Sequence, residues 1–214
     1  MRKILLLSII FLGQSCHSQN HLSENIDSII NTNNFNGVIL ITQDTNTIYK
    51  KATGYSDFET KTKLKFEDQF VIGSISKQIT AVLVLTAYEQ QLLKLTDTIS
   101  KHLPNLNQPW SNDITIHHLL THTHGIVSLG KPLAFLPGTK FKYSQLGYHL
   151  LAQILENIHQ KPFQYLCTEL FHKLNLKNTF HPQNKTYKIL RLFSWFWIFL
   201  RMLLYYKIDA YKGK

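Results

Sequence analysis

A serine and a lysine three residues apart, Ser74 and Lys77, have the types and the spacing that could do chemistry. A serine hydroxyl becomes a nucleophile when a base lies near it, and positions i and i+3 share one face of a helix. Apolar positions recur at helical spacing from Ser74 to about Gln91, without Pro or Gly, which predicts a helix that begins at Ser74. The hydroxyl would then lie at the positive end of the helix dipole, where a developing negative charge is favoured.

Two alternatives compete with a catalytic role for Ser74. The serine could be only the N-cap of its helix, because Ser-x-x-Lys arises often by chance. A second copy of the pattern runs from Ser128 to Lys131, although Gly130 and Pro132 disfavour a helix there. The surrounding sequence therefore has to decide between the two copies.

Five segments match, in order, the motifs of one enzyme family. They are Gly73-Ser74-Ile75-Ser76-Lys77-Gln78, Leu119-Leu120-Thr121-His122-Thr123-His124-Gly125, Pro137-Gly138-Thr139, Tyr143-Ser144-Gln145-Leu146-Gly147-Tyr148 and the stretch from Leu174 to Thr179. Over roughly residues 35 to 180, the chain resembles the beta-lactamase-related serine hydrolases, which include class C beta-lactamases, D,D-peptidases and esterases. Ser-x-x-Lys is the nucleophile motif of penicillin-recognising enzymes, so the resemblance selects Ser74 over Ser128.

The resemblance implies both a fold and a mechanism. The fold would be α+β, of the beta-lactamase/transpeptidase type, with an N-terminal β-hairpin and a helical subdomain. Ser74 would attack a carbonyl and form an acyl-enzyme, Lys77 would lower the proton affinities of serine and tyrosine, and Tyr143 would act as general base and then acid. The implied substrates are amides or esters, namely cell-wall peptides, beta-lactams or small esters, with no cofactor. By residue type alone, Tyr143 could instead be an aromatic residue that packs at the start of a helix.

Two positions depart from the family pattern within the matched segments. The second motif is usually Tyr-x-Asn, whereas Gln145 offers the same amide groups on an arm one methylene longer, so its positioning of substrate is altered. His124 stands where the family normally has serine. His118 and His122 have a spacing that could hold zinc on a helix, but we predict no metal site.

The family's third motif, Lys-Thr-Gly or His-x-Gly on a late strand, is not found in the sequence. Lys185-Thr186-Tyr187 lacks the glycine and comes too early. That strand normally supplies one N–H of the oxyanion hole, and losing one donor typically lowers the rate by about 10² to 10³. We therefore expect a truncated catalytic domain whose C-terminal strands are missing or diverged. A catalytically inactive homologue that serves as a binding, sensor or membrane-associated protein stays open as the alternative.

The N-terminal residues predict export. Arg2 and Lys3 precede an apolar run from Ile4 to Leu12, followed by small or polar residues through Ser18. The mature protein would then lie in the periplasm or outside the cell. A lipoprotein signal ending at Cys16 is the alternative, which the missing leucine three residues earlier disfavours.

The net charge of +10 is concentrated at the ends of the chain. Residues 19–160 contain 11 lysines and 11 acidic residues, whereas residues 161–214 contain ten basic and two acidic residues. A neutral main segment offers no basic face, so we predict no nucleic-acid partner. The sequence does not indicate an oligomeric state.

Three regions follow from these patterns: residues 1–18 as the signal, 19–185 as the partial catalytic domain and 186–214 as a basic, aromatic-rich tail. The tail has two interpretations. It could be an interfacial helix that contacts a membrane through residues 187–207, with Arg191 and Arg201 on its polar face. It could equally be out-of-frame sequence after a truncation.

The remaining pattern predicts the elements that must hold the site. A hairpin is expected from Asn36–Thr42 and Thr47–Thr53, followed by a loop that Gly54 and Asp57 open. Cys167 is expected in the core. Further helices are expected at Ile114–His122, Ser144–His159 and Pro162–Leu174.

Overall fold

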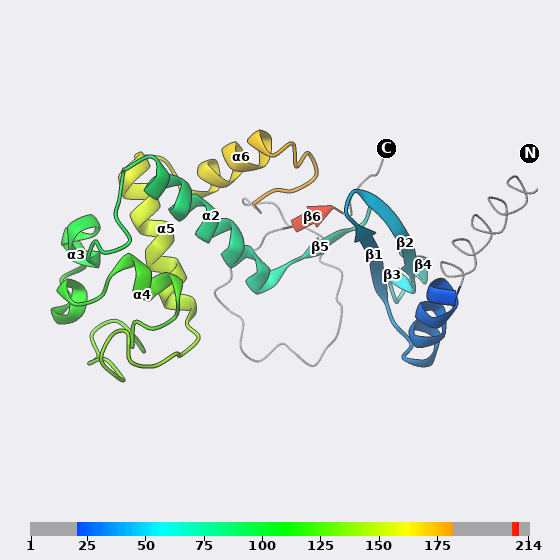
Figure 1. The fold of residues 1–214 in the computed structure, drawn as a ribbon, viewed down its shortest axis with the longest axis horizontal. Helices are drawn as coiled ribbons and strands as arrows, with labels where there is room; N and C mark the ends of the chain where they lie inside the picture. The colour runs from blue at the N-terminus through cyan, green and yellow to red at the C-terminus, as the bar shows by residue number, and fades with distance from the viewer. Residues whose placement is uncertain (1–20, 182–206, 210–214) are drawn as a thin grey trace, which may run out of the picture. The chain divides into compact units, whose positions relative to one another are not determined.

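The computed structural model describes residues 21–181 and the backbone of residues 207–209. The described residues form two compact units, of which one ends at Phe70 and the other begins at Val71 (Figure 1). The expected signal at residues 1–18 and nearly all of the tail at 186–214 lie outside the described residues. None of the helices in the described part of the chain is long and apolar enough to span a bilayer.

The first unit is built on the predicted hairpin, which the structure confirms. Residues 21–32 are helical, and β1 (Gly37–Gln43) pairs antiparallel with β2 (Asn46–Thr53). The loop predicted from Gly54 is partly wrong. A turn does follow Asp57, at residues 58–61, but β3 (Tyr55–Asp57) and β4 (Thr62–Lys63) form a second antiparallel pair. The side chain of Asn36 explains this: its Oδ1 accepts from the Tyr55 N–H at 2.6 Å and its Nδ2 donates to the Tyr55 carbonyl at 3.1 Å. These bonds hold the residues after Gly54 extended.

The second unit begins with the helix that carries Ser74. After β5 (Gln69–Val71), which pairs with β6 (Lys207–Asp209), a single 3₁₀ turn, η1 (Gly73–Ile75), leads into α2 (Ser76–Glu89). The predicted helix is confirmed, but its first residues adopt the tighter 3₁₀ geometry that is frequent at helix N-termini. Gly73 has φ of +52°, a left-handed value that glycine adopts without strain.

Two helices that border the site begin at side-chain caps. Thr115 caps α4 (Ile116–Leu120) by accepting from the His118 N–H at 3.2 Å, and Ser144 caps α5 (Gln145–His159) by accepting from the Gly147 N–H at 3.3 Å. α4 is shorter than the predicted Ile114–His122, because His122 has φ of +58° and cannot continue a right-handed helix. The other helical elements are α3 (Ile99–His102), η2 (Pro104–Leu106), η3 (Pro109–Asn112) and α6 (Phe163–Lys173).

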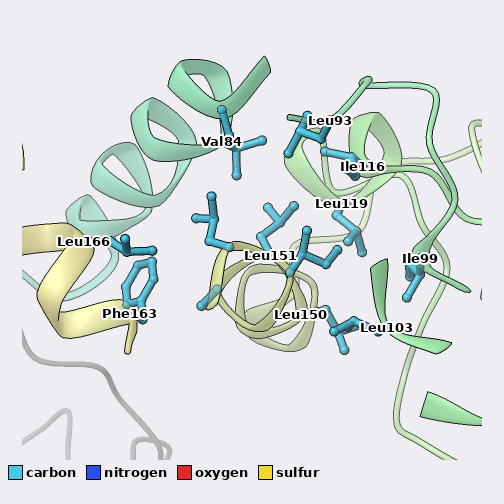
Figure 2. Packing of buried hydrophobic residues seen from close by; sticks show 14 of the residues in the cluster. Val84, Leu93, Ile99, Leu103, Ile116, Leu119, Leu150, Leu151, Phe163 and Leu166 are labelled. Atoms are coloured by element: carbon cyan, nitrogen blue, oxygen red, sulfur yellow. The ribbon is translucent and has the colours of Figure 1, made fainter. Parts of the chain in front are cut away.

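The core of the second unit surrounds α5, which contacts α2, α3, α4 and α6 (Figure 2). Leu151, Ile154 and Leu155 on α5 are fully buried, as is Cys167 on α6, where the sequence placed it. Val84 of α2 and Leu119 of α4 pack into the same cluster. The cluster therefore fixes α2 against α5, and the predicted catalytic groups lie at or just before the starts of these two helices.

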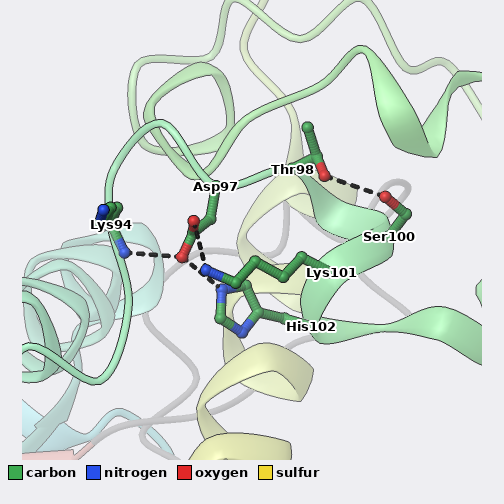
Figure 3. A network of polar contacts seen from close by, with 6 residues as sticks. All are labelled: Lys94, Asp97, Thr98, Ser100, Lys101 and His102. Carbon is green, nitrogen blue, oxygen red and sulfur yellow. Dashed lines mark hydrogen bonds and ion pairs between the residues drawn. The ribbon is translucent and has the colours of Figure 1, made fainter.

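A buried carboxylate ties the chain after α2 to α3 (Figure 3). Asp97, whose side chain is 9% exposed, accepts from the Lys94 N–H at 2.8 Å, from Lys101 Nζ at 2.7 Å and contacts His102 Nε2 at 2.9 Å. Burial disfavours the charge, but the bonds from Lys101, Lys94 and His102 outweigh it and lower the pKa of Asp97 to about 2. The ionised carboxylate therefore stabilises this connection.

We expect Asp97→Asn to lower the free energy of unfolding by about 2 kcal/mol at neutral pH, the value of a pKa lowered from 3.8 to about 2. Because the pKa is lowered on folding, this stability is complete above about pH 4 and is lost as the pH falls towards 2. Urea unfolding at several pH values measures it, with Asp113→Asn, at an exposed aspartate, as the matched control. If the difference in unfolding free energy between Asp97→Asn and wild type did not become smaller at acidic pH, this account would be contradicted.

Candidate active site

The hydroxyl of Ser74 lies between a tyrosine and a lysine. Its Oγ is 2.6 Å from Tyr143 Oη, in a hydrogen bond that either group could donate, and it accepts from Lys77 Nζ at 3.3 Å. The N-cap positions of η1 and α2 are Ile72 and Ile75. Ser74 is therefore not the capping residue of either segment, and its oxygen is directed to Tyr143 and Lys77.

Lys77 joins the two helices at the site. Its Nζ donates to Gln145 Oε1 at 2.6 Å and lies 4.9 Å from the centroid of the Tyr143 ring. Lys77 stands one turn after Ser74, whereas Gln145 is the first residue of α5. The structure thus brings together all four residues singled out in the sequence, Ser74, Lys77, Tyr143 and Gln145.

The surroundings of Tyr143 lower the pKa of its phenol. Partial burial raises its pKa, but the interactions with Lys77 and Ser74, the positive charge of Lys77 and the contact with Gln145 together outweigh burial. The net effect holds the pKa of Tyr143 below its usual value of 10. A tyrosine with these neighbours can accept the proton of the Ser74 hydroxyl at a lower pH than a free phenol could.

The histidines near the site have structural partners rather than the geometry of a metal centre. His118 Nδ1 accepts from the Thr115 N–H and His122 Nδ1 from the Ser144 N–H, both at 3.2 Å. Because α4 ends at Leu120, His118 and His122 do not share a helix face as the zinc spacing requires. Within residues 21–181, no group of three or more His, Cys, Asp or Glu side chains is placed to hold a metal ion.

His124, which replaces the serine of the family motif, is buried against α5. Its Nδ1 accepts from the Ile126 N–H at 2.9 Å, and a Cβ added at Gly147 would lie 2.6 Å from its Nε2. Burial, with the nearby His122 and His118, lowers the pKa of His124 to about 4, so the ring is neutral at physiological pH. The ring therefore requires glycine at position 147, one turn from Tyr143.

The second Ser-x-x-Lys copy has a different setting. Ser128 is exposed and lies in an irregular loop, and Gly130 has φ of +73°. Lys131 is therefore not one helical turn from Ser128, and the geometry favours the first copy.

Comparison with known proteins agrees with this fold. The Beta-lactamase family profile matches residues 22–186. Protein flp of Staphylococcus aureus strain MW2 is 28% identical over 171 residues, which cover 68% of this chain and 34% of that protein. The chain spans about a third of the length of this relative.

Solved structures show the same similarity. D-alanine carboxypeptidase AmpC of Burkholderia cenocepacia is 28% identical, with a TM-score of 0.65 over 72% of this chain and 47% of that one. EstCE1, described as a hydrolase with promiscuous acyltransferase activity, is 27% identical, with a TM-score of 0.61 over 68% of this chain and 48% of that one.

The fold and the matched motifs define a penicillin-recognising-type serine hydrolase scaffold. The chain belongs to the beta-lactamase family. The predicted α+β fold class is confirmed, with two-stranded sheets only among the described residues. The predicted boundaries of the three regions stay predictions.

His122 contacts the candidate base Tyr143, a role that the sequence did not indicate. In the sequence, His122 was notable only for the zinc-like spacing that it shares with His118. The available signal was its place inside the matched segment Leu119–Gly125, just after the expected helix. Its backbone conformation and its contact with Tyr143 follow only from the tertiary structure.

Proposed function

We propose that this protein is an exported serine hydrolase that forms an acyl-enzyme on Ser74. The observation that carries the proposal is the 2.6 Å contact between Ser74 Oγ and Tyr143 Oη, with Lys77 Nζ 3.3 Å from the same serine oxygen. A nucleophile within hydrogen-bond reach of its base, beside a cation, is the arrangement of activated serines. The predicted signal at residues 1–18 supports export.

In the proposed reaction, Tyr143 takes the proton of Ser74 as Oγ bonds to the substrate carbonyl carbon. The tetrahedral intermediate collapses, the bond from carbon to the leaving nitrogen or oxygen breaks, and Tyr143 returns the proton to the leaving group. Water then attacks the acyl-enzyme in the reverse sense, with Tyr143 again as base. The products are a carboxylic acid and an amine or alcohol.

Two groups are proposed to bind the substrate carbonyl and its neighbour atoms. The Ser74 N–H lies in the first turn of its helical segment, where N–H groups lack intrahelical acceptors, so it would donate to the oxyanion. Gln145 Oε1 accepts from Lys77 Nζ, and the amide Nε2, which contributes to the lowered pKa of Tyr143, carries two N–H groups, of which one would donate to a substrate acceptor.

The substrates we propose are amides or esters of small molecules or peptidoglycan-type peptides. One similar protein is a D-alanine carboxypeptidase and another is a hydrolase with acyltransferase activity. These names describe those proteins, and they support a cell-wall peptide, a beta-lactam or a small ester as the substrate class for this chain.

The test is reaction of the purified chain with a fluorophosphonate, a fluorescent penicillin and p-nitrophenyl acetate, followed by intact mass. We expect a single adduct of the probe's acyl or phosphonyl mass, with turnover of at least one of the two carbonyl probes. A penicillin adduct that persists without turnover would instead indicate a binding or sensor protein. A chain that unfolds cooperatively yet forms no adduct with any of the three probes would overturn the proposal.

A further inference from the structure

The backbone on both sides of Tyr143 is held by one residue, His122. The His122 carbonyl accepts from the Lys142 N–H at 2.9 Å, and His122 Nδ1 accepts from the Ser144 N–H at 3.2 Å. The imidazole also lies against the Tyr143 ring, with 4.8 Å between the two ring centroids. Tyr143 is thus the residue between two fixed peptide groups.

We infer that His122 is a positioning residue for the Ser74–Tyr143 contact, and that the acceptor at its Nδ1 fixes where the phenol lies. This inference rests on the proposed function, since it assigns a role in placing the base of that reaction. Tyr143 needs such support because the residue is 48% exposed. Misplacement of a reacting group by about 1 Å can lower a rate by about 10²-fold.

The imidazole can fill this role only when Nδ1 carries a lone pair. An N–H donor at Ser144 requires the neutral tautomer with its proton on Nε2. Burial, together with the positive charge of Lys77, holds the pKa of His122 below its usual value of 6.5. The same lysine that contacts Ser74 therefore also favours the acceptor form of His122.

A second tyrosine, Tyr148, also packs against the imidazole. The Tyr148 ring centroid lies 5.1 Å from that of His122, and the Tyr148 hydroxyl donates to the Leu120 carbonyl at 3.1 Å. The His122 ring thus packs against the aromatic rings of both Tyr143 and Tyr148. This packing restricts the rotation of His122 and keeps Nδ1 directed to Ser144.

The left-handed backbone of His122 offers a matched pair of variants. Glycine and asparagine are the residues that adopt φ near +58° with least strain, so neither variant should distort the turn. His122→Gly removes both ring and acceptor. His122→Asn restores an acceptor, because Asn Oδ1 stands at the same bond separation from Cα as His Nδ1.

Two measurements on the full chain test the inference. The first is the second-order rate of labelling by the fluorophosphonate. The second is the pH titration of Tyr143 by NMR of ¹³Cζ-tyrosine, assigned with Tyr143→Phe, which needs no activity. We expect the fluorophosphonate to label His122→Gly about 10- to 100-fold more slowly than wild type, and the Tyr143 pKa in this variant to move up towards 10. We expect His122→Asn to restore most of the labelling rate and most of the lowered pKa.

The outcomes separate this inference from the proposed function. Unchanged labelling and an unchanged Tyr143 titration in His122→Gly would overturn the inference while the hydrolase proposal stood. If His122→Asn had the same labelling rate and the same Tyr143 pKa as His122→Gly, the role of the Nδ1 acceptor would be overturned. A wild-type chain that is not labelled, but whose Tyr143 titration moves in His122→Gly and returns in His122→Asn, would support the positioning role and defeat the hydrolase proposal.

Discussion

Replacing Ser74 with alanine is expected to abolish adduct formation with the fluorophosphonate and the penicillin. The substitution removes the only atom that we propose forms the bond to the substrate carbon, so no covalent intermediate can form. Hydrolysis of any substrate the wild type turns over should fall by about 10⁴-fold or more, the scale of loss when a serine nucleophile is removed. Intact mass and the hydrolysis rate measure the two effects.

Ser128→Ala is the matched control, because Ser128 begins the second Ser-x-x-Lys copy but lies in an exposed loop. It should label at the wild-type rate. Adduct formation that survived in Ser74→Ala and disappeared in Ser128→Ala would refute our choice of nucleophile. Adducts in both variants would indicate non-specific labelling.

Replacing Tyr143 with phenylalanine should produce the second large loss. Phenylalanine keeps the ring beside His122 but removes the oxygen that lies 2.6 Å from Ser74 Oγ. General acid–base catalysis typically contributes about 10²- to 10⁴-fold, so we expect the rate of acylation to fall by that amount.

The pH dependence provides the more specific test of Tyr143. A base acts in its ionised form, so the wild-type acylation rate should rise with pH through the pKa of Tyr143 and then level off. That pKa lies below 10, since Lys77 and Ser74 favour the phenolate more than burial disfavours it. In Tyr143→Phe this rising limb should be absent. A Tyr143→Phe chain that kept both the rate and the limb would assign the base to another residue, with Lys77 as the next candidate.

Local pattern determined a large part of the architecture. The β1–β2 hairpin, α2, α5 and α6 were predicted from alternation, helical spacing and capping residues, all of which act between residues close in sequence. The contact between Ser74 and Lys77 is also local in sequence, because one helical turn brings residues i and i+3 together. The prediction of a loop directly after Gly54 was wrong because Asn36, distant in sequence, supplies the bonds that hold Tyr55 extended, so that the turn begins only after Asp57.

The sequence by itself determined the family and the four residues of the candidate site, because ordered motifs and i,i+3 spacing are local properties of a chain. Only the tertiary structure decided that Tyr143 meets Ser74 across 69 positions and that Gln145 accepts from Lys77. Those contacts exist because the buried faces of α2 and α5 pack in one core. The hydrophobic effect that buries these faces is non-directional. A hydrophobic pattern alone therefore does not specify which helices have their N-terminal ends next to each other. The role inferred for His122 depends on the same packing, which directs one imidazole nitrogen to the peptide group beside the base.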